Sequence, residues 1–370
     1  MLPARSVGPL AHASILPAVQ SVGVLEPGRV NSGIRRYGEV VAQALGSDGV
    51  SCVEVAITPS RRGRAAIRDA LRIVGAMRGT DAVILPYTRS NIWSPDALRL
   101  VQLAIVHLGL RRRTMTVMHD AYRPGGPNRM EWWVISLLMA LSGRVILHSE
   151  AERRQLRLVP GARRAKVIPH FVFERPQLDR AEARSRLDVG SHTQLVAMVG
   201  WMNPRKNYEL AVEALALLPQ STELWLIGGA GLRLDWYQEQ IEELARARGV
   251  DERLTITGSV PESELESRLA AIDVGLCPYQ RISASGSLST FLGARRPVIA
   301  TDVEFVRELA DLAPAVVHRL ERLDAETLAD RIMLALRRPA DPGAFEPILR
   351  QRSLAATSER YRREIRALAA

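Results

Sequence analysis

The 370-residue chain has few cysteines and few aromatic residues, and both shortages exclude certain classes of function. Its two cysteines, Cys52 and Cys277, lie in apolar segments without metal-ligand spacing, so we interpret them as buried thiols in a reducing compartment. No apolar run is long enough for a transmembrane helix. Aromatic residues make up 5% of the chain, and no recognised nucleic-acid motif occurs, so nucleic acid is not an expected partner.

The remaining composition is that of a soluble globular protein, with 47% hydrophobic and 24% charged residues. A chain of this length favours two domains. We interpret residues 1–18 as a loose leader and not a signal peptide, because Pro9 and Pro17 interrupt their apolar patch. A net charge of +10 permits anionic lipid or phosphorylated ligands as partners. We expect a cytoplasmic location.

Short buried strands alternate with helical segments over residues 19–173, which predicts a doubly wound α/β domain. The expected helices span residues 37–45, 61–77, 95–108 and 132–141. The expected strands span residues 21–25, 52–58, 82–85, 115–118, 144–147 and 166–172.

A polar segment over residues 174–192 is expected to be a linker with about one helical turn. The alternation resumes over residues 193–345 and predicts a second domain of the same kind. Its expected strands span residues 195–199, 223–227, 254–257, 274–277, 298–300 and 315–317. One helix, at about 347–368, lies in the final segment 346–370 and is expected to cross back toward the N-terminal domain.

A loop of small residues in the second domain has the pattern of an anion-binding site. Ser285, Gly286 and Ser287 follow the buried strand at 274–277 and precede a helical pattern that begins near Leu288. The N–H groups in the first turn of a helix, together with the helix dipole, attract negative charge. An ordinary strand-to-helix turn remains the alternative interpretation.

The motifs of the second domain resemble those of the donor domain in retaining GT-B glycosyltransferases of family 4, or group 1, which use nucleotide sugars. The N-terminal half resembles the acceptor domain through the segments 32–37 and His119-Asp120. The motifs that carry the resemblance in the second half are Val199-Gly200-Trp201-Met202-Asn203-Pro204-Arg205-Lys206-Asn207, Leu224-Trp225-Leu226-Ile227-Gly228-Gly229, Gly258-Ser259-Val260, Ala271-Ile272-Asp273-Val274 and Arg296-Pro297-Val298-Ile299.

This resemblance implies two Rossmann-like domains that face a central cleft and transfer a sugar with retention and without a metal or cofactor. Lys206 matches the lysine that binds phosphate in the family, Arg205 beside it could add a second contact, and His119 matches a histidine that touches the donor sugar. We interpret the other histidines as structural. The expected donor-binding residues are Ser32, Gly33, Gly200, Gly228, Val260, Ser285, Gly286, Ser287 and Thr290.

Three positions depart from the family pattern. Trp201 replaces an arginine that contacts phosphate, while Ile282 and Thr290 replace two glutamates, the second of which binds the nucleotide ribose. Threonine cannot hold a ribose diol with two charge-assisted hydrogen bonds. A catalytically silent GT-B protein that binds a partner is therefore the alternative. The run Gly228-Gly229-Ala230-Gly231 keeps a pyridine-nucleotide oxidoreductase as a further competitor, although it lacks the full dinucleotide fingerprint.

Arginines also gather on one side of the helical segment at 61–77, whose other side is apolar. Arg61, Arg64, Arg68 and Arg72 could contact an anionic membrane, each residue contributing about 1 kcal/mol near the surface. A solvated basic face is the alternative interpretation.

Overall fold

The computed structural model describes residues 19–27, 33–47, 49–57, 63–88, 98–119, 129–231, 234–280 and 285–369. The expectations for the leader at 1–18 and for Ser32, Arg61, Asp120 and Ile282 lie outside these residues.

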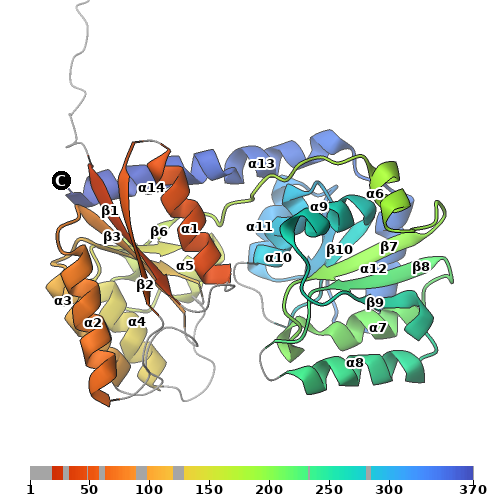
Figure 1. Ribbon diagram of the computed structural model, residues 1–370, viewed down its shortest axis with the longest axis horizontal. Helices are drawn as coiled ribbons and strands as arrows, with labels where there is room; N and C mark the ends of the chain where they lie inside the picture. Colours follow the sequence, from red (N-terminus) through yellow and green to blue (C-terminus); the bar gives the residue numbers. More distant parts are fainter. Residues whose placement is uncertain are drawn as a thin grey trace, which may run out of the picture.

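The described residues form two parallel six-stranded sheets. Figure 1 shows the two sheets in separate halves of the molecule. The N-terminal sheet contains β1 (Ser21–Pro27), β2 (Ser51–Ile57), β3 (Ala82–Tyr87), β4 (Thr114–Met118), β5 (Arg144–Leu147) and β6 (Lys166–Val167). Its strand order is β2-β1-β3-β4-β5-β6. Every residue of β3 and β4 is buried, as expected for central strands that are covered on both faces.

Alternate residues of these strands pack against two different layers of helices. Val83 and Leu85 face α2 (Gly63–Met77), α3 (Leu98–Gly109) and α4 (Arg129–Leu141). Ala82 and Ile84 face α1 (Gly33–Gly46) and the C-terminal helix α14 (Leu354–Ala369). The period-two alternation of a strand thus fills both cores. The short helices α5 (Glu150–Gln155) and η1 (Ala162–Arg164) complete this domain.

The second sheet has the order β12-β11-β10-β7-β8-β9. Its strands are β7 (Gln194–Val199), β8 (Thr222–Ile227), β9 (Leu254–Ile256), β10 (Val274–Cys277), β11 (Val298–Thr301) and β12 (Val317–Leu320). The intervening helices are η2 (Pro204–Lys206), α7 (Tyr208–Ala216), α8 (Asp235–Ala247), η3 (Asp251–Arg253), α9 (Glu262–Ala271), α10 (Gly286–Gly293), α11 (Glu304–Leu312), α12 (Ala325–Arg337) and η4 (Pro342–Phe345).

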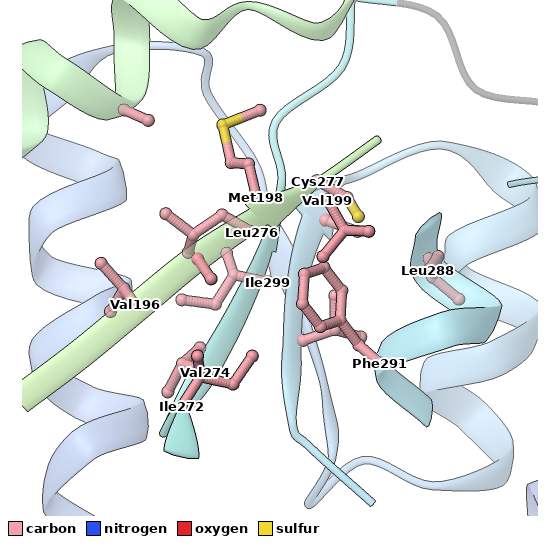
Figure 2. Packing of buried hydrophobic residues seen from close by; sticks show 14 of the residues in the cluster. Val196, Met198, Val199, Ile272, Val274, Leu276, Cys277, Leu288, Phe291 and Ile299 are labelled. Carbon is pink, nitrogen blue, oxygen red and sulfur yellow. The ribbon is translucent and has the colours of Figure 1, made fainter. Parts of the chain in front are cut away.

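Phe291 fixes α10 against the second sheet. Its ring lies over β10 beside Val199 in Figure 2, while the side chain of Leu276 points to the opposite face of the sheet. A Cβ atom at Gly275 would lie 2.4 Å from this ring, so only glycine at that strand position lets the helix approach so closely. This packing holds the start of α10 at the carboxyl edge of the sheet.

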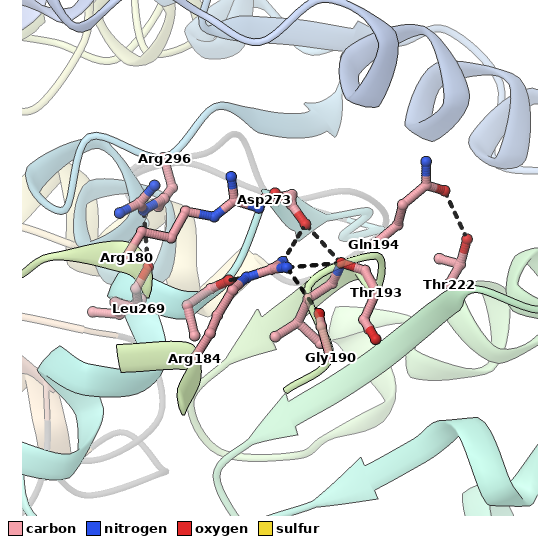
Figure 3. A network of polar contacts seen from close by, with 11 residues as sticks. Arg180, Arg184, Gly190, Thr193, Gln194, Thr222, Leu269, Asp273 and Arg296 are labelled. Carbon is pink, nitrogen blue, oxygen red and sulfur yellow. Dashed lines mark hydrogen bonds and ion pairs between the residues drawn. The ribbon is translucent and has the colours of Figure 1, made fainter. Parts of the chain in front are cut away.

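The linker contains more structure than we expected. Residues Arg180–Arg186 form the two-turn helix α6, which is capped by Asp179. Arg180 and Arg184 both contact the carboxylate of Asp273 (Figure 3). This carboxylate also accepts from the N–H of Leu195 at 2.8 Å. The helix is thereby attached to the C-terminal domain.

Three other expected elements differ from the structure. The strand expected at 166–172 ends at Val167, two residues before Pro169, which has no N–H for a strand ladder. The last strand begins at Val317 and not at Ala315, because the N–H groups of Val316 and Val317 bond back to Ala313. The expected terminal helix is two helices, α13 (Glu346–Arg352) and α14, since extended Ser353 accepts a bond from the N–H of Ala356 and caps the second.

The chain passes between the domains twice, and both passages are visible along the top of Figure 1. The second passage brings α14 onto the N-terminal domain, where the hydroxyls of Tyr361 and Tyr37 lie 2.9 Å apart. The N–H of Val172 also donates to the carbonyl of Arg352 at 2.7 Å. Within the described residues, no helix has the length and apolar character needed to span a membrane.

Candidate donor-binding site

Lys206 ends the short 3₁₀ helix η2, which begins with Pro204 at its first position. Its side-chain ammonium donates to the carbonyl of Val199 at 2.9 Å and lies 3.4 Å from the hydroxyl oxygen of Ser287. The Ser287 hydroxyl donates to the same carbonyl at 2.7 Å. Two residues that the sequence predicted for one site, from distant segments, therefore meet at the end of β7.

The Lys206 ammonium is in a partly dehydrated environment. Burial, together with the nearby Arg205 and against an opposing contribution from Cys277, lowers the pKa of Lys206 to about 8. The ammonium also lies 5.5 Å from the centre of the Tyr279 ring. At pH 7 the lysine is mostly protonated, and its charge is less screened by water than that of a surface lysine.

Two glycines with positive φ angles shape the space around this ammonium. Gly200 has φ +102°, and a Cβ there would lie 2.7 Å from Lys206 Nζ. Gly228 has φ +138°, and a Cβ there would lie 2.5 Å from the carbonyl oxygen of Gly200. The loops that follow β7 and β8 are therefore in close contact, so a side chain at Gly228 would displace the neighbouring loop, and one at Gly200 would displace the Lys206 ammonium.

The next loop along the sheet carries Val260, which is half-buried. This loop is joined to the glycine loops, because the N–H of Gly228 donates to the Thr257 hydroxyl at 3.2 Å and Gly228 forms a bridge with Gly258.

Helix α10 begins beside Lys206. Its N-cap is Ser285, whose hydroxyl oxygen accepts from the N–H of Leu288 at 3.1 Å. A Cβ atom added to Gly286 would have no neighbour within 4 Å, so a ligand has room beside the first turn. The half-buried Thr290 lies one turn further along the helix. The start of this helix and the lysine together make a cationic surface suited to phosphate.

The other predicted residues are not part of this contact group. Arg205 is exposed, and its guanidinium pairs with no carboxylate among the residues that the structure describes. Its backbone carbonyl accepts from the N–H of Gln280 at 3.0 Å. Gly33 is the first residue of α1 in the other domain. Trp201, at a position where the family has arginine, is 46% exposed.

His119 lies in a cluster of histidines on the N-terminal domain. Its ring centre is 4.9 Å from that of Tyr37 and 5.1 Å from that of His148. His170 joins the cluster, 5.5 Å from His148 and 4.9 Å from Tyr37. In the described part of the chain, no hydrogen bond or ring contact joins His119 to Lys206.

The three imidazoles are neutral at physiological pH. Burial lowers the pKa of His119 to about 3, with His170 contributing, and lowers that of His170 to about 4. Burial also holds the pKa of His148 well below its usual range. A neutral imidazole can donate one hydrogen bond and accept another.

Two of the histidines that we interpreted as structural, His148 and His170, lie in the same ring cluster as His119. His119 and His148 directly follow β4 and β5, and His170 follows the short β6 by three positions. Carboxyl ends of neighbouring parallel strands meet at one sheet edge, so this shared position was a usable signal. The described residues contain no group of three or more His, Cys, Asp or Glu side chains placed to hold a metal ion.

Comparisons with known proteins agree with this geometry. Residues 193–338 match the family model described as glycosyl transferases group 1. A curated relative, D-inositol 3-phosphate glycosyltransferase from Kineococcus radiotolerans, is 25% identical over 201 residues, which are 51% of this chain and 45% of the relative. The match thus spans less than half the length of that relative.

Solved structures show the same fold over nearly the whole chain. HepE of Anabaena, solved with UDP and glucose, has a TM-score of 0.76 at 16% identity, and the match covers 94% of this chain and 100% of HepE. Sucrose-phosphate synthase of Thermosynechococcus elongatus has a TM-score of 0.75 at 17% identity, over 94% of this chain and 99% of that one. WaaG, a glycosyltransferase involved in lipopolysaccharide biosynthesis, has a TM-score of 0.63 at 16% identity. The match covers 93% of this chain and 99% of WaaG.

The fold class is that of the two-domain GT-B proteins, as the sequence predicted. The match of residues 193–338 to the glycosyl transferases group 1 model agrees with the resemblance seen in the motifs of the second half.

Proposed function

We propose that the chain is a glycosyltransferase that moves a sugar from a nucleoside-diphosphate donor to an acceptor on the N-terminal domain, with retention and without a metal. The observation that supports this most is the meeting of the Lys206 ammonium with Ser287 at the start of α10. Negative charge builds up on the leaving diphosphate during transfer, and a fixed cation with helix N–H groups stabilises it.

The remaining residues fit roles around that leaving group. Gly200 and Gly228 leave room for a phosphate to approach the backbone. The guanidinium of Arg205, which pairs with no carboxylate of the described residues, can add a second contact. His119, neutral at pH 7, can accept or donate a hydrogen bond to a sugar hydroxyl. HepE has been solved with UDP-glucose, which favours a hexose on a nucleoside diphosphate as donor. The product would enter a glycan, a glycolipid or a glycosylated metabolite.

A catalytically silent binding protein is the second candidate. Exposed Trp201 and uncharged Thr290 favour it, because neither can supply the charge that the family pattern has at these positions. A silent protein would bind a nucleoside diphosphate without breaking the bond between sugar and phosphate.

The two candidates are separated by binding and turnover of nucleotide sugars. Thermal unfolding is measured with UDP-, GDP-, TDP- and ADP-sugars, and the stabilising donor is then assayed for release of nucleoside diphosphate. Stabilisation with release supports the transferase, and stabilisation without release under any acceptor tested supports the silent protein. No stabilisation by any of them contradicts both.

We further propose that the chain is cytoplasmic and contacts an anionic membrane through α2. The exposed arginines Arg64, Arg68 and Arg72 lie along this helix with Leu71, which is 57% exposed. The acidic residue of the helix, Asp69, is buried. A basic face with an exposed leucine suits a bilayer that contains anionic lipid.

The membrane proposal is tested by sedimentation with phosphatidylglycerol vesicles. Replacing Arg64, Arg68 and Arg72 by alanine should weaken binding roughly a hundredfold, since each arginine contributes about 1 kcal/mol. The matched control replaces three exposed arginines of the C-terminal domain, Arg246, Arg248 and Arg322. Equal losses in both variants would show a general charge effect and would contradict a surface on α2.

A further inference from the structure

A cavity of about 470 Å³ opens at the amino edge of the N-terminal sheet. Arg112 precedes β4, Arg144 begins β5 and Lys166 begins β6, and all three line this cavity. The histidine cluster lies at the carboxyl ends of the same three strands. The cavity is therefore on the opposite edge of the sheet from the residues proposed to contact the donor sugar.

The lining of this cavity is strongly cationic. Four basic residues contribute to it, Arg112, Arg144, Arg164 and Lys166, and no acidic residue does. Arg144 is also paired with Glu364 of α14, whose carboxylate oxygen lies 3.1 Å from the Arg144 Nε atom. Four positive charges around one cavity repel one another, and a bound anion would relieve that repulsion.

Two of the four cations are anchored by backbone carbonyls. Arg144 donates to Gly143 at 3.1 Å and to Ala367 at 3.4 Å, and Arg164 donates to Met139 at 3.1 Å. The other two, Arg112 and Lys166, are exposed and pair with no carboxylate in the described part of the chain. The cavity thus combines two fixed cations with two that remain available to a ligand.

Close backbone contacts form the walls of the cavity. A Cβ at Gly143 would lie 1.9 Å from the carbonyl oxygen of Arg112 and 2.3 Å from the side chain of Leu368. Three turns of the N-terminal domain and the end of α14 therefore meet here without room for a larger residue. Arg112 has φ 64°, a left-handed conformation that arginine rarely adopts, and it places this side chain at the cavity.

We propose that this cavity is a second binding site, separate from the donor site, for an organic phosphate of about the size of a sugar phosphate. Its volume lies within the range of roughly 300–1,000 Å³ typical of small-molecule sites. Guanidinium groups bind phosphate oxygens in pairs through parallel hydrogen bonds, and a lysine adds a compact charge. The proposal does not depend on the activity of the donor site.

Calorimetric titration with glucose 6-phosphate, with glucose as the uncharged control, tests the proposal. The variant Arg112→Asn/Lys166→Gln removes the two available charges, and asparagine tolerates the left-handed conformation at 112. We expect saturable binding of the phosphate that weakens at least about tenfold in this variant, as two charge-assisted contacts are lost. Arg163→Ala is the control. Arg163 is exposed and lies in η1 beside the cavity-lining Arg164, but it does not line the cavity itself.

Thermal unfolding of each variant checks that the fold is intact, and a second pair, Arg112→Lys and Lys166→Arg, should retain binding. Absence of binding to the parent protein would overturn the proposal. Equal binding of glucose, or an equal loss in Arg163→Ala, would also overturn it.

The phosphate could belong to a soluble metabolite or to a lipid headgroup, and vesicles distinguish these sources. Phosphatidylglycerol vesicles are tested with a protein whose α2 arginines are replaced by alanine, so that α2 does not contribute. Residual vesicle binding that glucose 6-phosphate displaces assigns the site to a lipid headgroup. Binding of glucose 6-phosphate without vesicle binding assigns it to a soluble phosphate.

Discussion

The ammonium nitrogen of Lys206 lies 3.4 Å from the hydroxyl oxygen of Ser287, although 81 positions separate them in the chain. Both groups donate to the carbonyl oxygen of Val199. The last residue of β7 thus holds the lysine and the first turn of α10 in one place before any ligand arrives. Such fixed positions cost little reorganisation during the reaction.

Removal of the Lys206 charge should therefore reduce transfer more than stability. We expect Lys206→Ala to lower kcat/KM for the donor by about two to three orders of magnitude, because a lost transition-state contact of this kind costs a few kcal/mol. The measurement is steady-state kinetics with the stabilising donor, alongside thermal unfolding. Turnover equal to that of the parent would show that this lysine does not contact the leaving group.

The pKa of Lys206, about 8, gives the reaction a pH dependence with a defined sign. In the proposed reaction the protonated ammonium would stabilise the diphosphate, and this form is lost as pH rises through about 8. We expect kcat/KM to fall as the pH rises through about 8, over roughly one pH unit on either side of this pKa. In Lys206→Arg, whose guanidinium stays charged, the fall should disappear. A fall that persists there belongs to another group.

The sequence predicted this site better than it predicted the surroundings of His119. Lys206, Gly200 and Ser287 each belong to a local pattern of a strand followed by a turn, so local rules place them correctly. The contact between Tyr37 and Tyr361 depends on how α14 returns to the first domain, and no local pattern encodes such a path. His148 and His170 were missed because they were considered one by one and not as ends of neighbouring strands.

The basic cavity could not be foreseen for the same reason. Arg112, Arg144 and Lys166 lie in three separate turns, and only the parallel order of β4, β5 and β6 brings them together. The linker helix α6 was underestimated because its attachment depends on the distant Asp273.

Gly200 gives a test of the shape of the donor site. A methyl group in Gly200→Ala would lie 2.7 Å from Lys206 Nζ and would push the ammonium from its place. We expect kcat/KM to fall by at least about tenfold and stability by about 1–3 kcal/mol, the usual cost of an unfavourable φ. Kinetics and chemical denaturation measure the two effects.

The control for that test is Gly249→Ala, at a glycine that also has positive φ but no neighbour within 4 Å of its added Cβ. It should lose stability and keep its kcat/KM. If both variants lose activity in proportion to stability, the contact with Lys206 is not responsible.

Thr290 gives a test of ribose binding. If the ribose lies where the family pattern places it, Thr290→Glu should tighten binding of a nucleoside diphosphate, since a charged hydrogen bond contributes about 1.5–3 kcal/mol. Glutamine has the size of glutamate without its charge, so Thr290→Gln should gain much less affinity for the nucleoside diphosphate. Calorimetric titration of all three proteins decides, and weaker binding to the glutamate variant would mean that the ribose lies elsewhere.

Glu262, at the start of α9, joins the two domains. Its carboxylate accepts from Arg36 of α1 at 2.9 Å and from Arg175 of the linker at 2.6 Å. Hydrogen bonds from Arg36, then from Arg175, hold the pKa of Glu262 below its usual range. The carboxylate is therefore charged at neutral pH, and this interdomain contact weakens only as the pH falls through that lowered pKa.

Loss of this contact should favour separation of the domains. The exposed pair of Arg36 and Glu262 contributes at most about 1 kcal/mol, so Glu262→Gln should change the ratio of open to closed molecules by up to about fivefold. Since α6 is fixed to Asp273 and the N–H of Arg175 donates to the carbonyl of Gly293 in α10 at 3.1 Å, we expect the first hinge before Arg175, with the second near Ser353. Solution scattering should show a larger radius of gyration for the variant without ligand.

A saturating donor should return the variant to the compact form, because in the proposed complex the diphosphate would contact both domains and so favour the closed arrangement. The matched control is Glu213→Gln, which removes an exposed pair with Arg248 inside one domain and should leave the radius unchanged. In Gly33→Trp, an indole at the start of α1 should block the approach of diphosphate, and the donor should no longer compact the protein. A radius that stays constant in the parent protein at saturating donor would contradict closure altogether.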